Sequence, residues 1–175
     1  MNYLYHWVPK NMTGHVLYPL NVLKEKYPEA YEEHKSKYKG REEVMALVIP
    51  RINCLWNDVL HLSAIHPKMV KEAVAEAGWR SDYVMRCYQI DPHILDPEKA
   101  VVFLYTTPEP DMAKEDDFVE FNPGEMDKYS SLPQETTAHY KESYKNKKKP
   151  LTFHRAPHIF YKGSVNIANC PIVEV

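Results

Sequence analysis

The sequence predicts a single α+β domain over residues 1–175, with a mixed, mainly antiparallel sheet and a few short helices. Two observations predict this class. Segments typical of strands and of helices are interspersed at irregular intervals without an internal repeat, which favours α+β over a doubly wound parallel sheet. The length of 175 residues and the hydrophobic content of 44% are those of one domain that can bury a core.

The first elements are a strand and short helices. Residues 3–8 alternate aromatic and apolar side chains around His6 and predict a strand. Residues 21–31 have helical spacing, but Pro28 interrupts them, so we expect two short helices or one kinked helix. Residues 29–41 are highly charged, which predicts a solvated face or a loop.

The most unusual stretch covers residues 51–67. It contains Arg, Asn, Asp, Ser and two His, and burying such groups is costly unless each finds a partner. Residues 52–62 within it predict a strand, and residues 42–48 before it predict a short helix or strand. A helix is expected at residues 67–77, because Pro67 suits the first turn and Gly78 suits the end. Either a dense hydrogen-bond network or a binding site accounts for the polar residues.

The second half of the chain predicts more strands than helices. Residues 100–106 are its most apolar segment and are expected at the centre of the sheet. One helix is expected at residues 133–144, where Thr136, Tyr140 and Tyr144 align. Further strands are predicted at residues 83–90, 118–121, 151–153, 158–161 and 167–175.

Composition excludes several classes of function. Only five glycines are present and no Gly-rich phosphate loop, which excludes Walker-type and Rossmann nucleotide binding. The net charge of -2 gives no general attraction to nucleic acid, so such a partner needs a local basic patch. The most basic patch that the chain offers contains Lys147, Lys148, Lys149 and Arg155, next to aromatic residues.

The cysteines and the hydropathy pattern indicate a cytoplasmic protein. The three cysteines are far apart and form no CxxC pair, which argues against a disulfide framework and against a cysteine zinc site. The N-terminus lacks a basic region followed by an apolar run, and no apolar segment reaches the roughly eighteen residues of a membrane span. We therefore expect no export signal and no membrane partner.

The N-terminal motif carries a resemblance to a known family. The run LYHWV at residues 4–8, followed by Asn11-Met12 and by LYPL at residues 17–20, resembles the opening of small ADP-ribosyltransferase-like domains. The resemblance implies NAD as the cofactor, with His6 on a ribose hydroxyl, an aromatic residue against the nicotinamide and a late Glu beside the reacting ribose. The aromatic and polar residues 56–63 match the place of the family's second strand.

The chemistry of ADP-ribosyl transfer indicates which kinds of residue should contact NAD. A cationic ribosyl centre needs a nearby carboxylate, and a departing nicotinamide needs a π-stacking wall. We expect NAD contacts from His6, Trp56, Asn57, His61 and Tyr105.

The catalytic acid is less well defined. The Glu-x-Glu or Gln-x-Glu pattern of the family is absent, because Gln134 and Glu135 are adjacent. Glu120, Glu125, Glu135 and Glu174 remain open, and we select Glu135.

Other functions compete with this interpretation. The main alternative is a module without catalysis that recognises a nucleotide, a nucleic acid or a protein. A metal site would draw on His61, His66, His154 and His158 with Asp58, but both His pairs lack a fixed helical face, so we assign no metal ligands.

Two catalytic alternatives have weaker support. His61-Leu62-Ser63 resembles the His-x-Ser/Thr unit of two-histidine phosphoesterases, but those enzymes carry the unit twice and only one copy is present here. Cys54 lies near His61 in sequence, but its apolar surroundings are typical of a buried core cysteine.

Overall fold

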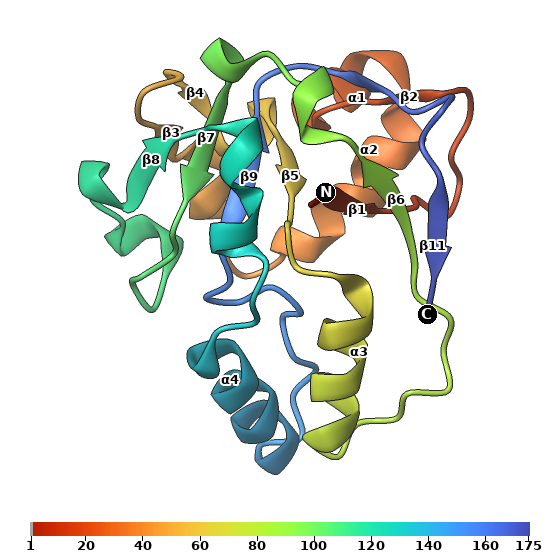
Figure 1. The fold of residues 1–175 in the computed structure, drawn as a ribbon, viewed down its shortest axis with the longest axis vertical. Coiled ribbons are helices and arrows are strands. Elements are labelled where there is room, and N and C mark those ends of the chain that lie inside the picture. Colours follow the sequence, from red (N-terminus) through yellow and green to blue (C-terminus); the bar gives the residue numbers. More distant parts are fainter. Residues whose placement is uncertain (1) are drawn as a thin grey trace.

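The computed structural model describes residues 2–175 and shows an α+β fold (Figure 1). In the described chain all paired strands are antiparallel, which confirms the predicted class and makes its sheets antiparallel throughout. The strands are β1 Leu4–Trp7, β2 Val16–Leu17, β3 Val48–Ile49, β4 Cys54–Leu55, β5 Leu60–Leu62, β6 Arg86–Ile90, β7 Ala100–Phe103, β8 Phe118–Glu120, β9 His158–Tyr161, β10 Val165–Asn166 and β11 Ile172–Glu174. The α-helices are α1 Leu20–Lys26, α2 Pro28–Lys35, α3 Pro67–Glu76 and α4 Gln134–Lys145.

Two sheets form the centre of the molecule. One has the strand order β5-β9-β7-β8, and the other has the order β1-β6-β11. Tyr5 and Ser63 join them, because the Tyr5 amide donates to the Ser63 carbonyl over 2.7 Å and the Ser63 amide donates back over 3.1 Å. The end of β5 therefore lies against β1. Two shorter pairs, β10-β2 and β3-β4, complete the strand arrangement.

The two faces of the four-stranded sheet carry different side chains. Side chains alternate along a strand, so neighbouring residues point to opposite faces. We call one the aliphatic face, and it is defined by Leu60, Leu62, Val102 and Ile159. We call the other the cavity face, and it is defined by His61, Phe103, His158 and Phe160. As predicted, β7 lies inside the sheet, and all four of its residues are buried.

Aromatic rings organise the cavity face. The Phe103 ring stacks on Phe118, with ring centroids 4.8 Å apart, and on Tyr105, with centroids 5.0 Å apart. Trp56 meets Phe160 edge to face at a centroid distance of 4.8 Å. Such arrangements are the favoured ones for aromatic pairs and add to the free energy gained by burial.

Several helix ends lie where the sequence predicts, but α2 continues past residue 31 to Lys35, within the segment expected to be a solvated face or a loop. The first predicted helical segment is two helices, because Pro28 opens α2 directly after α1. α3 opens at Pro67, and Gly78 follows it with a φ of 101°, a left-handed conformation that suits glycine. α3 and α4 lie side by side at one end of the molecule, away from α1 and α2 (Figure 1).

Two strand predictions were wrong. Residues 52–62 are not one strand, because a 3₁₀ helix, η3 (Trp56–Asp58), separates β4 from β5. The Asp58 carboxylate stabilises this turn by accepting from the Leu55 amide over 2.8 Å. Residues 151–153 form turns and pair with no strand. The Leu151 amide donates to His139, and the Thr152 carbonyl accepts from Tyr140, so side chains of α4 take the place of a strand partner. Among the described helices, none has the length and apolar character needed to cross a membrane.

Candidate functional site

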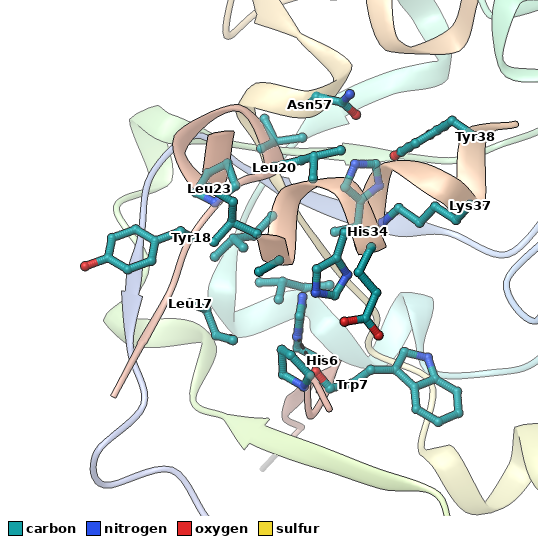
Figure 2. Close-up of a pocket in the computed structure, with 18 of the residues that line it drawn as sticks. His6, Trp7, Leu17, Tyr18, Leu20, Leu23, His34, Lys37, Tyr38 and Asn57 are labelled. Carbon is teal, nitrogen blue, oxygen red and sulfur yellow. Dashed lines mark hydrogen bonds between the residues drawn. The ribbon is translucent and has the colours of Figure 1, made fainter. Parts of the chain in front are cut away.

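A large cavity lies between the N-terminal segment and the cavity face of the sheet. Its volume is about 1260 Å³. Its walls come from β1, α1, α2 and the 3₁₀ helix η1 (Ser36–Tyr38) on one side, and from η3 and β5 on the other. Figure 2 shows His6 and Trp7 at one end of this space and Asn57 at the other, with His34 and Lys37 between them. Pockets for small ligands are commonly several hundred Å³, so this one has room for a dinucleotide.

The cavity brings together the residues selected as NAD contacts. His6, Trp56, Asn57, His61 and Tyr105 all line it, although they come from three separate parts of the chain. Their roles toward NAD remain predictions, since proximity alone does not identify a ligand.

The structure does not bring Glu135 to this cavity. Glu135 is an exposed residue in the first turn of α4 and is not among the lining residues. The two carboxylates on the wall are instead Glu29 and Glu33, both on α2. The Glu33 carboxylate accepts a hydrogen bond from Asn11 over 3.2 Å. Sequence reasoning passed over both residues because the charged segment 29–41 predicted only a solvated surface.

Three histidines of the wall are held in the same way. Each donates one ring N–H to a backbone carbonyl: His6 to Trp7 over 2.7 Å, His61 to Trp56 over 3.1 Å and His158 to Ala156 over 2.8 Å. In a neutral ring the second nitrogen is then an acceptor. In the described chain no protein group donates to that second nitrogen in any of the three residues, so each one offers a free acceptor.

Burial keeps these imidazoles neutral. It lowers the pKa of His6 and of His158 to about 4, and it lowers the pKa of His61 well below its usual value. The positive charge of Lys37 adds to this effect by further lowering the pKa of His6 and His61. The three rings nevertheless keep some exposed surface, because the cavity lies beside them. At neutral pH the wall therefore offers hydrogen-bond acceptors without charge.

Tyr105 combines a strained backbone with a defined partner. Its φ is 54°, a left-handed conformation that is uncommon for a bulky residue and that often accompanies a functional site. A hydrogen bond joins its Oη to the Nδ1 of His154 over 3.1 Å. Burial raises the pKa of Tyr105 to about 12 and lowers the pKa of His154 to about 4, so the tyrosine keeps its proton.

Asn57 is the least satisfied polar group of the wall. Only 3% of the residue is exposed, and its Oδ1 has no hydrogen-bond partner. Most buried polar atoms have a partner, so this atom is an exception, although it lies beneath the cavity surface and not on it. This residue was selected from its sequence neighbourhood alone.

The other sequence-level candidates do not form sites of this kind. Within residues 2–175, no group of three or more His, Cys, Asp or Glu side chains is arranged to hold a metal ion. Cys54 is buried, and this burial raises its thiol pKa, which opposes a nucleophilic role.

The predicted basic patch is only partly exposed. Lys147, Lys148 and Lys149 are exposed, but Arg155 donates to the Thr106 carbonyl over 2.8 Å. Phe160, an aromatic residue of the same region, is fully buried in the core, so it cannot stack on bases.

Comparisons of the chain with protein-family models, with curated proteins and with solved structures found no match.

Proposed function

We propose that this chain binds NAD in the cavity and acts as an ADP-ribosyltransferase-like protein on an acceptor. One observation carries the proposal: the five residues selected from the sequence for NAD binding line a single cavity of about 1260 Å³. Three of the five are neighbours in residues 56–61, so the cavity unites three separate segments of the chain.

The histidines support a ligand with several hydroxyl groups. His6, His61 and His158 each present an unprotonated nitrogen, and ribose hydroxyls donate hydrogen bonds to such acceptors. A purely hydrophobic ligand would leave these three acceptors unsatisfied.

The aromatic residues support a flat ring as part of the ligand. Trp56 and Tyr105 both line the cavity and are both fixed by packing on Phe103, with centroid distances of 5.7 Å and 5.0 Å. Only 6% of each residue is exposed, so a nicotinamide or an adenine would contact the uncovered part of a fixed ring.

The reaction itself is a substitution at the ribose attached to nicotinamide. The bond from C1′ to the nicotinamide nitrogen breaks, nicotinamide leaves with the electron pair, and a new bond forms between C1′ and the acceptor. The acceptor proton passes to solvent water, because the lowered pKa of His6 and of His61 makes both rings weak bases. We assign the stabilising carboxylate to Glu33 in place of Glu135, because Glu33 lines the cavity.

Binding is tested by calorimetric titration of the protein with NAD. We expect saturable binding by the parent and a loss of affinity of about tenfold or more in His6→Ala, since a group that hydrogen-bonds the ligand is removed. The matched control is His93→Ala, an exposed histidine outside the cavity, which should bind NAD as the parent does. The proposal fails if the folded parent shows neither heat nor a rise in melting temperature at millimolar NAD.

Catalysis is tested by the release of nicotinamide from NAD. We expect Glu33→Gln to bind NAD but to lose most of the release, and Glu135→Gln to behave as the parent. The opposite result would return the role of the acid to Glu135.

A binding module without catalysis is the second candidate. One observation favours it: the carboxylates of the wall, Glu29 and Glu33, are both exposed rather than buried beside the imidazoles. Saturable NAD binding by the parent without any release of nicotinamide, alone or with candidate acceptors, would support this module over the transferase.

A further inference from the structure

None of the four basic residues on the cavity wall, Lys10, Lys26, Lys37 and Arg41, has an acidic partner in the described chain, and two of them share a support. Lys37 lies in η1, and Arg41 directly precedes the 3₁₀ helix η2 (Glu42–Ala46). The ion pairs of the described chain include neither residue. The only hydrogen bond from the Arg41 guanidinium is a long one of 3.4 Å to the Lys37 carbonyl. Both charges are therefore available to a ligand.

A buried tyrosine ring holds the two cations together. The Nζ of Lys37 lies 5.2 Å from the centroid of the Tyr38 ring, and the Cζ of Arg41 lies 5.6 Å from the same centroid. Tyr38 is only 5% exposed, so it provides a fixed support for both side chains. Figure 2 shows the ends of Lys37 and Tyr38 pointing to the same side, between Asn57 and His34.

The surrounding charges leave this part of the cavity positive. Burial and, after it, the charge of Arg41 lower the pKa of Lys37. Burial and, after it, the charge of Lys37 lower the pKa of His34. The acidic residues of the wall, Glu29 and Glu33, are outnumbered by the four basic residues Lys10, Lys26, Lys37 and Arg41. Like charges held together without a counterion favour the binding of an anion.

We propose that Lys37 and Arg41 form an anion subsite for the phosphate groups of the ligand, which makes the ligand class a nucleoside diphosphate rather than a neutral nucleoside. A guanidinium offers paired donors that match phosphate oxygens, and an ammonium adds a point charge. The identification of the ligand as NAD rests on the proposed function. The subsite itself requires only a phosphorylated ligand.

The test compares ligands that differ in their phosphates. NAD, ADP-ribose, inorganic pyrophosphate and nicotinamide riboside are titrated calorimetrically into the parent, Lys37→Met and Arg41→Met. Methionine keeps most of the apolar stem while it removes the charge. The matched control is Lys39→Met, which removes an exposed charge from the same segment outside the cavity. Folding is checked through the melting temperature of each variant.

We expect the variants to lose affinity only for the ligands that carry phosphate groups. Lys37→Met and Arg41→Met should each weaken ADP-ribose and NAD about tenfold or more and leave nicotinamide riboside unchanged, whereas Lys39→Met should bind as the parent does. Added KCl should weaken the parent's affinity for ADP-ribose more than that of Lys37→Met, because a charge contact has been removed.

Failure of this inference can be told apart from failure of the proposed function. Normal NAD affinity in both variants would overturn the subsite while NAD binding stands. Pyrophosphate or ADP-ribose binding that Lys37→Met loses, in a parent that does not bind NAD, would support the subsite and reject NAD as the ligand. A parent that binds none of the three phosphorylated probes overturns the subsite as well.

Discussion

The two faces of the four-stranded sheet differ in chemistry although alternate residues of the same strands build them. Ile159 on the aliphatic face is fully buried among apolar side chains, and its neighbour His158 on the cavity face contacts aromatic rings and the cavity. In β5, Leu62 and His61 alternate in the same way, although Leu62 also borders the cavity. A single register of strand pairing therefore determines both a close-packed core and a polar wall.

This difference shows how imidazoles are tolerated in the interior. On the aliphatic face a polar group would have no partner, and its burial would cost several kcal/mol. On the cavity face each imidazole has one backbone carbonyl as partner and keeps the second nitrogen toward open space. The cavity thus lowers the free-energy cost of placing these polar residues in the interior.

The largest effect is expected on the aliphatic face. Ile159→Ala should lower the free energy of unfolding by about 2–5 kcal/mol, because it leaves a void among fully buried neighbours. Denaturation in guanidinium chloride measures this loss, and Ile94→Ala, at an exposed position, is the control. A loss of less than about 1 kcal/mol in Ile159→Ala would contradict the close packing of the aliphatic face.

The second prediction concerns the loss of stability at acid pH that two histidines of the cavity wall cause. His6 and His158 have a pKa of about 4 in the folded chain, below the usual 6.5, so the unfolded chain binds more protons between these values. Their contribution to stability is complete above pH 6.5 and is lost as the pH falls toward 4. We expect a loss of about 2 kcal/mol from the pair, with allowance for the partial exposure of both rings.

The measurement is denaturation at pH 7 and pH 4.5 for the parent and for His6→Gln/His158→Gln. The double variant should lose less stability on acidification than the parent. Equal losses would show that these two rings do not govern the acid response.

A third prediction replaces a single imidazole by an apolar residue. His158→Leu should change the free energy of unfolding by less than about 1 kcal/mol at pH 7, because an aromatic surrounding accepts leucine. At pH 5 the variant should be more stable than the parent, since leucine cannot be protonated. A variant that is much less stable at both values would mean that the hydrogen bond to Ala156 governs the position.

A similarly small effect is expected at Tyr105. Tyr105→Phe removes the hydrogen bond to His154 but keeps the stacking on Phe103, so the cost should be about 0.5–1.5 kcal/mol. The change in unfolding free energy is compared with that of Tyr129→Phe, a partly buried tyrosine outside the cavity. A loss above about 3 kcal/mol would show that the hydroxyl supports more of the wall than its single bond indicates.

Several elements could be predicted because local chemistry determines them. Pro67 and Gly78 limit α3, and Pro28 separates α1 from α2, since proline and glycine act through their own backbone. β7 was predictable from its continuous apolar run. Residues 52–62 were not, because Asp58 turns the chain through hydrogen bonds that periodicity does not report.

The site was predictable only in part. His6 and His61 stood out as polar residues within apolar strands, which is a local signal. Lys37 and Arg41 gave no such signal, because a charged segment looks the same whether it borders water or a cavity. Glu135 was selected for its place next to Gln134, and a pair of adjacent residues does not indicate which side of α4 faces the site. Convergence of distant segments depends on tertiary contacts that one sequence does not display.

The sheet that carries His6 also has a consequence for the kinetics of folding. Its strands β1, β6 and β11 come from residues 4–7, 86–90 and 172–174, so their pairing closes two very long loops. Closing such loops costs chain entropy before any stabilising contacts form, so we expect this sheet to form late in folding. During synthesis on a ribosome, the sheet that contains β1 is complete only after residue 174 has been made. The cavity wall includes residues from Tyr5 to His158, so it too forms only after most of the chain has been made.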